Sequence, residues 1–349
     1  GSIIMGGYFK HLIEQDEAMG YLFGGVATDA NSHFDFIATA VYAQFGLNIS
    51  SRLKLNSNLR FENNTYDYTG TSQGMALPPV WFQTDDSMMG YRTSLQYVMD
   101  KSTSLYSSVS QGYKSGGVNQ QPFLSDASRP YEPEFIQNFE IGLKRATKKY
   151  QTQLSAFYSL RKDQQVSVSS QQDKENPNSF LFYTDNAGSG TIQGFEWENT
   201  LNVSSNLNMD ASLGYLTTWV DKFTYFAAEG VEAIGGDRKA AMSPEITGSV
   251  GFNYENESGF FASTLMSFKD EYYFSDSHDQ KSEPYSLLNL TFGKSFEKIT
   301  ATICIRNAMD ERYTTRGFYF GLIPPDYPDQ LWKSYGDPRQ IGVTIDYTF

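Results

Sequence analysis

The segment Asp276-Ser277-His278-Asp279 holds the residue types in this 349-residue chain that could do chemistry, and Asp270, Glu271 and Glu283 are its neighbours. Carboxylates and an imidazole can bind a divalent metal, and an Asp/His pair can activate water for hydrolysis. The competing interpretation is a solvated acidic loop, which external loops commonly form. We favour the loop, and therefore expect no catalytic residue, no metal site and no enzyme activity.

A glycine motif and the single cysteine are the other features that could carry chemistry. Gly188-Ser189-Gly190 with Gly194 is not a dinucleotide-binding loop, because the last glycine is one place too far along and no helix is expected to follow. Glycine here fits a strand that leaves a loop. Cys304 is the single cysteine, which excludes an internal disulfide and a cysteine metal cluster. We expect no cofactor.

Composition narrows the class of protein. The net charge of -13 gives no clustered basic surface for phosphates, so we expect no nucleic-acid partner. Mean hydropathy is -0.46, and no stretch approaches the ~20 apolar residues of a membrane-spanning helix. Tyrosine (24) and phenylalanine (26) are abundant, as expected where aromatic rings lie at two membrane interfaces.

Alternation of apolar and polar residues is the main structural signal. In the last nine residues the apolar positions are Ile341, Val343, Ile345, Tyr347 and Phe349. Because successive side chains of a strand point to opposite faces, these residues form one apolar face. Such segments recur about fourteen times. Charged faces such as Arg52 to Glu62 must meet water, so a wide barrel with lipid outside and a hydrated or plugged lumen fits best.

The expected connections alternate between short and long. The short turns are Asn48-Arg52, Met99-Ser102, Ala146-Lys149, Val203-Asn206, Glu255-Gly259 and Phe296-Lys298. The long connections are Ile13-Ser32, Tyr66-Ser87, Gly116-Pro133, Gln165-Gly190, Asp221-Pro244, Asp270-Glu283 and Tyr313-Arg339. Bacterial outer-membrane barrels have short periplasmic turns and long external loops. We therefore expect the long connections outside the cell and the carboxy terminus on the periplasmic side.

Five motifs add a family resemblance. They are Gly112-Tyr113-Lys114-Ser115-Gly116-Gly117-Val118-Asn119, Tyr131-Glu132-Pro133-Glu134 followed by Asn138 to Lys144, Asn186-Ala187-Gly188 with Gly194-Phe195-Glu196, Ile305 to Tyr313, and the terminal Tyr347-Thr348-Phe349. In this order and spacing, residues 100–349 resemble the C-terminal barrel of TonB-dependent outer-membrane receptors. Residues 1–99 fit only a generic barrel.

The resemblance implies an all-β, transmembrane, antiparallel up-and-down barrel. We expect residues 1–349 to form one partial barrel domain, about 14 C-terminal strands of a 22-strand barrel, with the plug and the energy-coupling box outside this chain. Gly1-Ser2-Ile3 enters an expected strand without a signal sequence, so we expect a fragment whose first and last strands do not pair.

The implied function is energised uptake of a large, scarce nutrient, such as an iron-siderophore complex, across the outer membrane of a Gram-negative bacterium. The implied partners are outer-membrane lipid, the nutrient ligand and a TonB-type energy-coupling protein. Two alternatives stay open. One is a passive outer-membrane channel of about fourteen strands, and the other is a barrel-borne hydrolase with its site at Asp276, His278 or Asp279.

Aromatic residues in or near the expected long connections are the candidate ligand contacts: Trp81, Tyr225 and Trp332. The competing role, for Trp81, Trp332 and Trp219, is anchoring at a membrane interface. Pro324-Pro325 stiffens the last long connection, which would give either a preformed ligand-facing loop or a rigid surface loop.

Overall fold

The computed structural model describes residues 1–22, 27–74, 79–119, 129–171, 180–228 and 231–349. All regular elements in these ranges are β-strands. They are β1 Ser2–Leu22, β2 Ala27–Asn48, β3 Leu53–Gly74, β4 Val80–Val98, β5 Thr103–Lys114, β6 Gly117–Val118, β7 Pro130–Tyr131, β8 Glu134–Ala146, β9 Tyr150–Gln171, β10 Phe180–Asn202, β11 Leu207–Val220, β12 Phe223–Ala228, β13 Val231–Gly235, β14 Ile246–Glu255, β15 Phe260–Lys269, β16 Tyr285–Ser295, β17 Ile299–Arg306, β18 Thr314–Gly321, β19 Asp329–Tyr335 and β20 Gln340–Tyr347. In these ranges, no helix is both long enough and apolar enough to cross a membrane.

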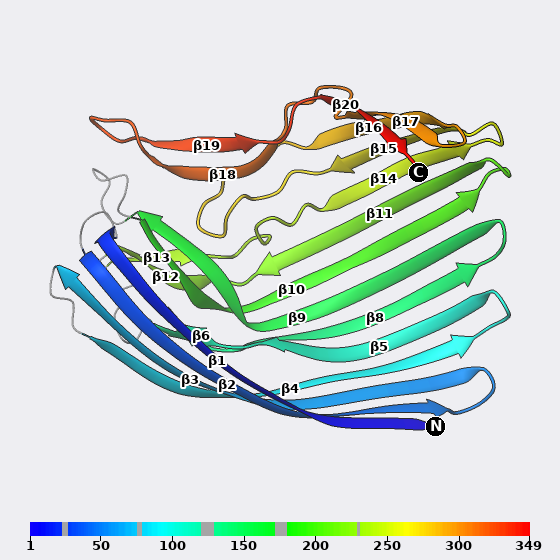
Figure 1. The fold of residues 1–349 in the computed structure, drawn as a ribbon. Coiled ribbons are helices and arrows are strands. Elements are labelled where there is room, and N and C mark those ends of the chain that lie inside the picture. The colour runs from blue at the N-terminus through cyan, green and yellow to red at the C-terminus, as the bar shows by residue number, and fades with distance from the viewer. Residues whose placement is uncertain (23–26, 75–78, 120–128, 172–179, 229–230) are drawn as a thin grey trace.

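Fourteen strands form one antiparallel sheet, in the order β1-β2-β3-β4-β5-β8-β9-β10-β11-β14-β15-β16-β17-β20. Figure 1 shows them side by side in a curved sheet, with both chain ends at the edge that holds the short turns. The other strands form three pairs, β6-β7, β12-β13 and β18-β19, inside connections of the large sheet. The expected antiparallel up-and-down arrangement of about fourteen strands is confirmed.

The strands β1 and β20 stand at the two ends of this order. They are therefore not sheet neighbours in the part of the chain that the structure describes. A closed channel of fourteen strands would require that pairing, because closure is what satisfies the backbone groups of the two edges. The interpretation as a complete fourteen-stranded channel gains no support from this strand order.

The six short connections that the sequence predicts are confirmed. Each leaves three or four residues between consecutive strands of the large sheet. The turn after β14 shows how the sequence specifies one of them. Asn256 Oδ1 accepts hydrogen bonds from the backbone N–H groups of Ser258 and Phe260. Gly259 has a φ of 79°, where a side chain would collide with the backbone of Ser295, so glycine is required there.

Two of the predicted long connections are wrong, because strands continue through them. β1 reaches Leu22 and β2 begins at Ala27, so most of Ile13–Ser32 is strand. Tyr66–Ser87 lies largely in β3 and β4 in the same way. The period-two signal is lost in these extensions, because Glu14 to Glu17 is polar on both faces and Val80 to Phe82 is apolar on both. The backbone hydrogen bonds between the strands do not depend on this side-chain pattern, so the strands continue.

The other predicted long connections hold more structure than expected. Gln165–Gly190 is mostly strand, since β9 and β10 run into it from both sides. Asp221–Pro244 contains β12 and β13, and Tyr313–Arg339 contains β18 and β19. Residues 120–128, 172–179 and 229–230 of these connections, with 23–26 and 75–78 of the two above, lie outside the described residues.

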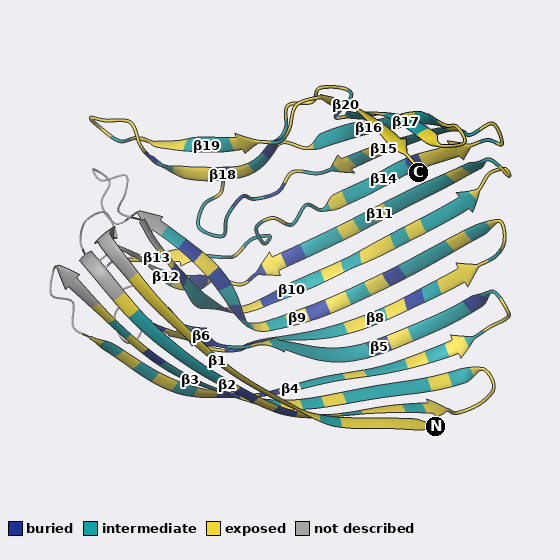
Figure 2. Cartoon of the chain, in the orientation of Figure 1, coloured by how far each residue is buried: buried dark blue, intermediate teal, exposed yellow. Residues whose placement is uncertain are grey.

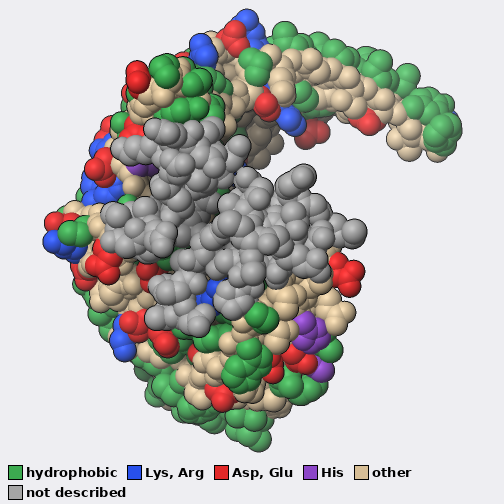
Figure 3. Space-filling view, turned by 90° about the vertical axis from the view of Figure 1, so that its left-hand side faces the viewer, with side chains coloured by type: hydrophobic (Ala, Val, Ile, Leu, Met, Phe, Trp, Pro, Cys, Tyr) green, Lys and Arg blue, Asp and Glu red, His purple; other side chains and the backbone are tan. Residues whose placement is uncertain are grey.

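The register places apolar side chains of neighbouring strands in common rows, because residues directly opposite each other point to the same face. Across β16, β17 and β20 two such rows are Leu290, Ile305, Ile341 and Phe292, Ile303, Val343. The alternate rows are Thr291, Cys304, Gly342 and Gly293, Thr302, Thr344. Buried and exposed residues accordingly alternate in bands along the strands (Figure 2). In the arm at the upper right of Figure 3, hydrophobic side chains lie along the outer, convex edge and charged side chains along the inner edge.

This register predicts different effects for arginine at two adjacent positions. Leu290→Arg puts a charge on the apolar face and should lower the free energy of unfolding in lipid vesicles by roughly 2 to 4 kcal/mol near the midplane. Thr291→Arg puts it on the polar face and should cost much less. Asn289 is a poor control, because its Oδ1 accepts a 3.0 Å hydrogen bond from the backbone N–H of Asn307. Denaturant titration in phospholipid vesicles measures both variants, and equal losses would contradict the register.

Candidate functional site

A cavity of about 1060 Å³ lies among the long connections. Four parts of the chain line it: the ends of β9 and β10, residues 241–242, residues 274–278, and the β18-β19 hairpin. Six aromatic side chains contribute to its walls: Phe182, Phe274, Phe318, Tyr319, Phe320 and Trp332. The charged and titratable groups are Asp276, His278, Arg316 and Asp329. This aromatic pocket can hold a large organic ligand by stacking and by a few polar contacts.

Arg238 organises one wall of the aromatic pocket. Its Nη1 donates hydrogen bonds to the backbone oxygen of His278 at 2.8 Å and to Asp279 Oδ1 at 2.6 Å, and its Nη2 donates to the backbone oxygen of Ser275. The guanidinium also lies over the ring of Tyr273, 4.4 Å from its centroid. The planar fork of arginine suits such multiple contacts. One side chain therefore fixes the path of residues 273–279.

Further hydrogen bonds tie the same wall to the sheet and to residues 241–242. Ser277 Oγ accepts from the backbone N–H of Ser169 at 3.1 Å, and Asp276 Oδ1 accepts from the backbone N–H of Ala241 at 3.1 Å. The backbone N–H of Met242 donates to the oxygen of Tyr273 at 2.8 Å. Residues 273–279 are thus held by hydrogen bonds to Arg238, to Ser169 of β9 and to residues 241–242.

These contacts bear on the chemistry considered for Asp276, His278 and Asp279. Asp279 pairs with Arg238, Asp276 accepts from Ala241, and His278 Nδ1 accepts from the backbone N–H of Gln280 at 3.3 Å. The described ranges contain no group of three or more His, Cys, Asp or Glu side chains that could hold a metal. The contacts assign these three residues to loop architecture and give no support to hydrolysis.

His278 is half-buried between the two walls. Its ring lies 6.0 Å from the ring of Tyr319, centroid to centroid. Burial lowers the pKa of His278 below its ordinary value, and the positive charge of Arg238 lowers it further. The imidazole is therefore neutral at neutral pH, and protonation would place a second cation next to the guanidinium.

The β18-β19 hairpin forms the opposite wall. Gly317 lies flat against the ring of Phe274, where any side chain would collide with it. The hydroxyl of Tyr272 lies 3.3 Å from the backbone oxygen of Thr314, to which it donates. Trp332 Nε1 donates to the backbone oxygen of Phe320 at 3.1 Å, so the hydrogen-bonding group of this indole is used within the hairpin while the side chain lines the pocket.

The three aromatic residues proposed from the sequence lie in different places. Trp332 lines the aromatic pocket. Tyr225 lies on β12 and packs with Phe223 against a small apolar cluster. Trp81 is not in a connection, as the sequence predicted, but on β4, opposite Thr69 of β3 and 66% exposed. Their role as ligand contacts stays a prediction.

Sequence reasoning missed most of the aromatic pocket. Phe182, Phe274 and Phe318 line it but were not proposed. A search for every aromatic residue in the long connections would have found them, because phenylalanine rings stack on ligands as tryptophan rings do. No sequence signal shows that these particular rings meet.

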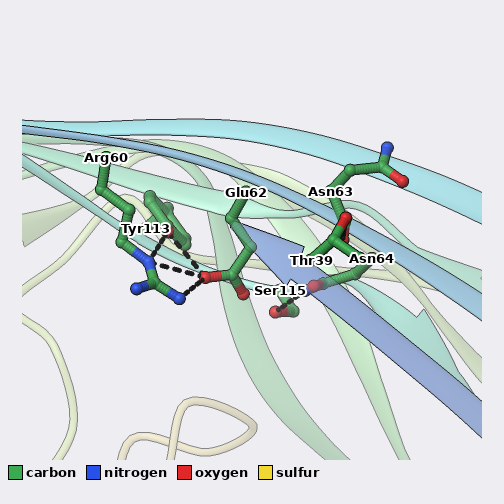
Figure 4. Close-up of polar contacts among 7 residues, drawn as sticks. All are labelled: Thr39, Arg60, Glu62, Asn63, Asn64, Tyr113 and Ser115. Atoms are coloured by element: carbon green, nitrogen blue, oxygen red, sulfur yellow. Dashed lines mark hydrogen bonds and ion pairs between the residues drawn. The ribbon is translucent and has the colours of Figure 1, made fainter. Parts of the chain in front are cut away.

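A polar cluster lies on the concave face of the sheet, away from the aromatic pocket. Arg60 Nε donates to Glu62 Oε2 at 2.8 Å, and the hydroxyl of Tyr113 donates to the same oxygen at 3.0 Å. The amide of Asn64 lies 2.8 Å from the hydroxyl of Ser115. Figure 4 shows these contacts between β3 and β5 or its following residue. Arg60 and Glu62 thus form a charge pair on this face.

The Arg238 contacts can be tested by substitution. Arg238→Gln removes charge-assisted hydrogen bonds from two backbone oxygens and one carboxylate, so amide exchange in residues 270–283 should rise by at least about tenfold. Lys239→Gln is the matched control, because Lys239 makes one exposed ion pair with Glu245 at 2.8 Å, of little expected weight. Exchange measured by mass spectrometry compares the two, and equal protection in both variants would contradict this assignment.

The lowered pKa of His278 predicts a pH effect on the same wall. Because the folded state binds this proton less well than the unfolded state, protection is complete above about pH 6.5 and falls as the pH drops below that value. Amide exchange of residues 270–283 is compared between the natural protein and His278→Gln at each pH, which cancels the intrinsic exchange rates. The difference should grow between about pH 7 and pH 5. A constant difference would show that His278 does not titrate there.

Comparison with known proteins places the chain in a family. Residues 5–308 match the family described as TonB dependent receptor-like, beta-barrel. The pesticin receptors of Yersinia enterocolitica and Yersinia pestis are each 22% identical over 300 residues. These matches cover 81% of this chain and 40% of the relatives. The chain therefore spans less than half the length of the curated relatives it matches.

Solved structures show the same fold at low sequence identity. The ferric yersiniabactin uptake receptor FyuA from Yersinia pestis matches with a TM-score of 0.79 at 17% identity, over 99% of this chain and 51% of that one. The siderophore receptor PiuA from Acinetobacter baumannii matches with a TM-score of 0.73 at 14% identity, over 92% of this chain and 44% of that one. With the family match over most of its length, this chain belongs to the TonB-dependent receptor β-barrel family.

Proposed function

We propose that this chain forms wall and external loops of an outer-membrane receptor for energised uptake of a large, scarce nutrient, such as an iron-siderophore complex. The observation that carries the proposal is the aromatic pocket, built from four loop-side segments of a barrel that belongs to a receptor family. A cavity of about 1060 Å³ has the size of a site for a large organic ligand.

The two faces of the sheet support a membrane position. Apolar side chains cover the convex face, where Ile341, Val343 and Ile345 are each about 70% exposed. Paired polar groups such as Arg60 and Glu62 lie on the concave face. Lipid outside and water or a plug inside satisfy both faces. We place the protein in the outer membrane of a Gram-negative bacterium, and treat residues 1–349 as one barrel unit.

The orientation follows from the connections. The six short turns and the carboxy-terminal strand end lie at one edge of the sheet (Figure 1), and short turns are periplasmic in this class. The aromatic pocket then opens outside the cell, where it meets the ligand first. The energy-coupling partner is a periplasm-spanning protein of the TonB type, which would act through a part of the receptor that the described residues do not include.

Ligand recognition in this proposal uses stacking and few charges. Trp332 and Phe318 present rings on the β18-β19 hairpin, and Phe182 presents one from β10. Tyr225 and Trp81 are proposed as outlying contacts. FyuA is described as a ferric yersiniabactin uptake receptor and PiuA as a siderophore receptor, and the extension of such a role to this chain is part of the proposal. No covalent chemistry is assigned to the receptor.

Uptake assays on the full-length receptor test the proposal. Trp332→Ala should weaken binding of the transported ferric complex by roughly tenfold, because it removes one central ring of the pocket. Trp219→Ala is the control, since Trp219 is an exposed tryptophan of β11 outside the pocket. Binding and uptake of radioactive iron complexes are measured in cells under iron limitation.

A second condition separates energised uptake from diffusion. Discharging the inner-membrane proton gradient should stop uptake while binding to intact cells persists, because a plugged lumen offers no diffusive route to a large solute. Uptake that continues unchanged would exclude the energised mechanism. Equal binding by the Trp332 and Trp219 variants would exclude the aromatic pocket as the ligand site.

A further inference from the structure

The edge of the sheet that holds the short turns carries an uneven distribution of charge. The first three short turns join β2 to β3, β4 to β5 and β8 to β9, and they follow one another along this edge (Figure 1). With the last turn of β8 included, they form a basic patch of five cations: Arg52, Lys101, Arg145, Lys148 and Lys149. The other three short turns contain Glu257, Glu297 and Lys298 as their charged residues.

Backbone hydrogen bonds join the turns of the basic patch to their neighbours. The N–H of Val98 donates to the oxygen of Arg52 at 2.7 Å, and the N–H of Ala146 donates to the oxygen of Ser102 at 2.8 Å. The strands β2, β3, β4, β5, β8 and β9 each have two neighbours in the large sheet. The patch therefore lies within the wall and not at its open ends.

The charges of the basic patch have no partner in the protein. All five side chains are exposed, and in the part of the chain that the structure describes none of them forms an ion pair. Asp100 is the carboxylate of these turns, and its Oδ1 accepts hydrogen bonds from the backbone N–H and the hydroxyl of Ser102 at 2.7 and 2.8 Å. The patch with Asp100 keeps a net charge of +4, in a chain whose net charge is -13.

The convex face beside the patch shows where the membrane ends. Arg145 shares a polar cross-strand row with Thr152, and the adjacent row away from the turns is apolar. Trp197 belongs to that apolar row, and its Nε1 donates to Thr152 Oγ1 at 3.1 Å. The guanidinium of Arg145 lies over the ring of Tyr150, 5.5 Å from its centroid. Tryptophan and tyrosine mark the level of lipid head groups, so Arg145 lies in that layer. The apolar row is Leu53, Tyr97, Leu105, Leu143, Leu154 and Trp197.

The turns themselves stay close to the lipid. Two of them begin with an exposed apolar side chain, since Ile49 is 52% exposed and Met99 is 44% exposed. These residues stand two positions after Leu47 and Tyr97, so they continue the lipid-facing side of their strands. Contact with lipid removes such side chains from water. Lysine can keep its hydrocarbon stem along this surface and place the ammonium among the head groups.

We propose that the basic patch binds the phosphate of an anionic phospholipid, such as phosphatidylglycerol, in the periplasmic leaflet of the membrane. The unpaired cations attract a head group with net negative charge, whereas the ammonium of phosphatidylethanolamine is repelled. An acidic protein would also suit the charge. A lipid fits better because one molecule contacts the cations with its head group and the adjoining apolar row with its acyl chains. The inference rests on the proposed membrane position and orientation, and does not depend on the transported ligand.

The experiment uses the full-length receptor in detergent, titrated with dioleoyl phosphatidylglycerol or dioleoyl phosphatidylethanolamine. Native mass spectrometry gives the apparent Kd of each lipid. The test variant combines Lys148→Gln with Lys149→Gln, and the control combines Lys294→Gln with Lys298→Gln, which removes the same charge beside the β16-β17 turn. The Kd of phosphatidylglycerol should rise about 30-fold in the test variant, because each cation near an anionic lipid surface contributes roughly a factor of five. It should stay unchanged in the control, and that of phosphatidylethanolamine should stay unchanged in both.

Three results would overturn the proposal. The first is an equal Kd of phosphatidylglycerol in the test variant and the natural receptor, and the second is an equal loss in the test variant and the control. The third is a natural receptor that does not prefer phosphatidylglycerol to phosphatidylethanolamine, which would leave the patch to an acidic protein. Circular dichroism confirms that both variants are folded.

The leaflet is tested separately on intact cells. Lys149→Cys should react with an impermeant thiol reagent no more than the unchanged receptor does, and stronger labelling would overturn the periplasmic position of the patch. Uptake of the ferric complex by the Lys148→Gln, Lys149→Gln variant tests the proposed transport independently, so lipid binding and transport can fail separately.

Discussion

The backbone hydrogen-bond ladder is the interaction on which the rest of this molecule depends. In hydrocarbon, an unpaired N–H or C=O group has no water to bond with, so a strand can cross a membrane only beside other strands. The antiparallel order of fourteen strands meets this demand by giving every strand of the large sheet except β1 and β20 two neighbours. Because the ladder uses backbone groups alone, side chains are free to vary, which permits a common fold with FyuA at 17% identity.

The ladder also fixes what each face can be. Side chains alternate, so a slip of one residue between two strands would carry Leu290 to the concave face and Thr291 to the convex face. The apolar row of Leu290, Ile305 and Ile341 and the polar row beside it therefore hold the register as firmly as the turns do. On the concave face Arg60 pairs with Glu62. The result is a wall with a lipid side and a wet side.

Beyond the membrane, the same hydrogen-bonded strands support the aromatic pocket. The extended ends of β9 and β10 carry one side of the aromatic pocket, and Arg238 holds the segment that forms the next. This part of the protein relies on hydrogen bonds and ring contacts in place of lipid contact, and half-buried His278 gives it a group whose charge depends on pH. The β18-β19 hairpin closes the pocket from the other side.

The sequence by itself predicted about fourteen strands in an up-and-down order, the six short turns and the family, because alternation and turn residues act over a few neighbouring positions. Ile341 to Phe349 show this most clearly. The sequence did not determine the strand extensions in Ile13–Ser32, where no regular alternation of apolar and polar residues remains. Only the tertiary structure brought Ser169 to Ser277, 108 residues apart, and showed Trp332 in a pocket and Trp81 outside it. Such contacts depend on how distant connections fold over the barrel end, and no local pattern records that.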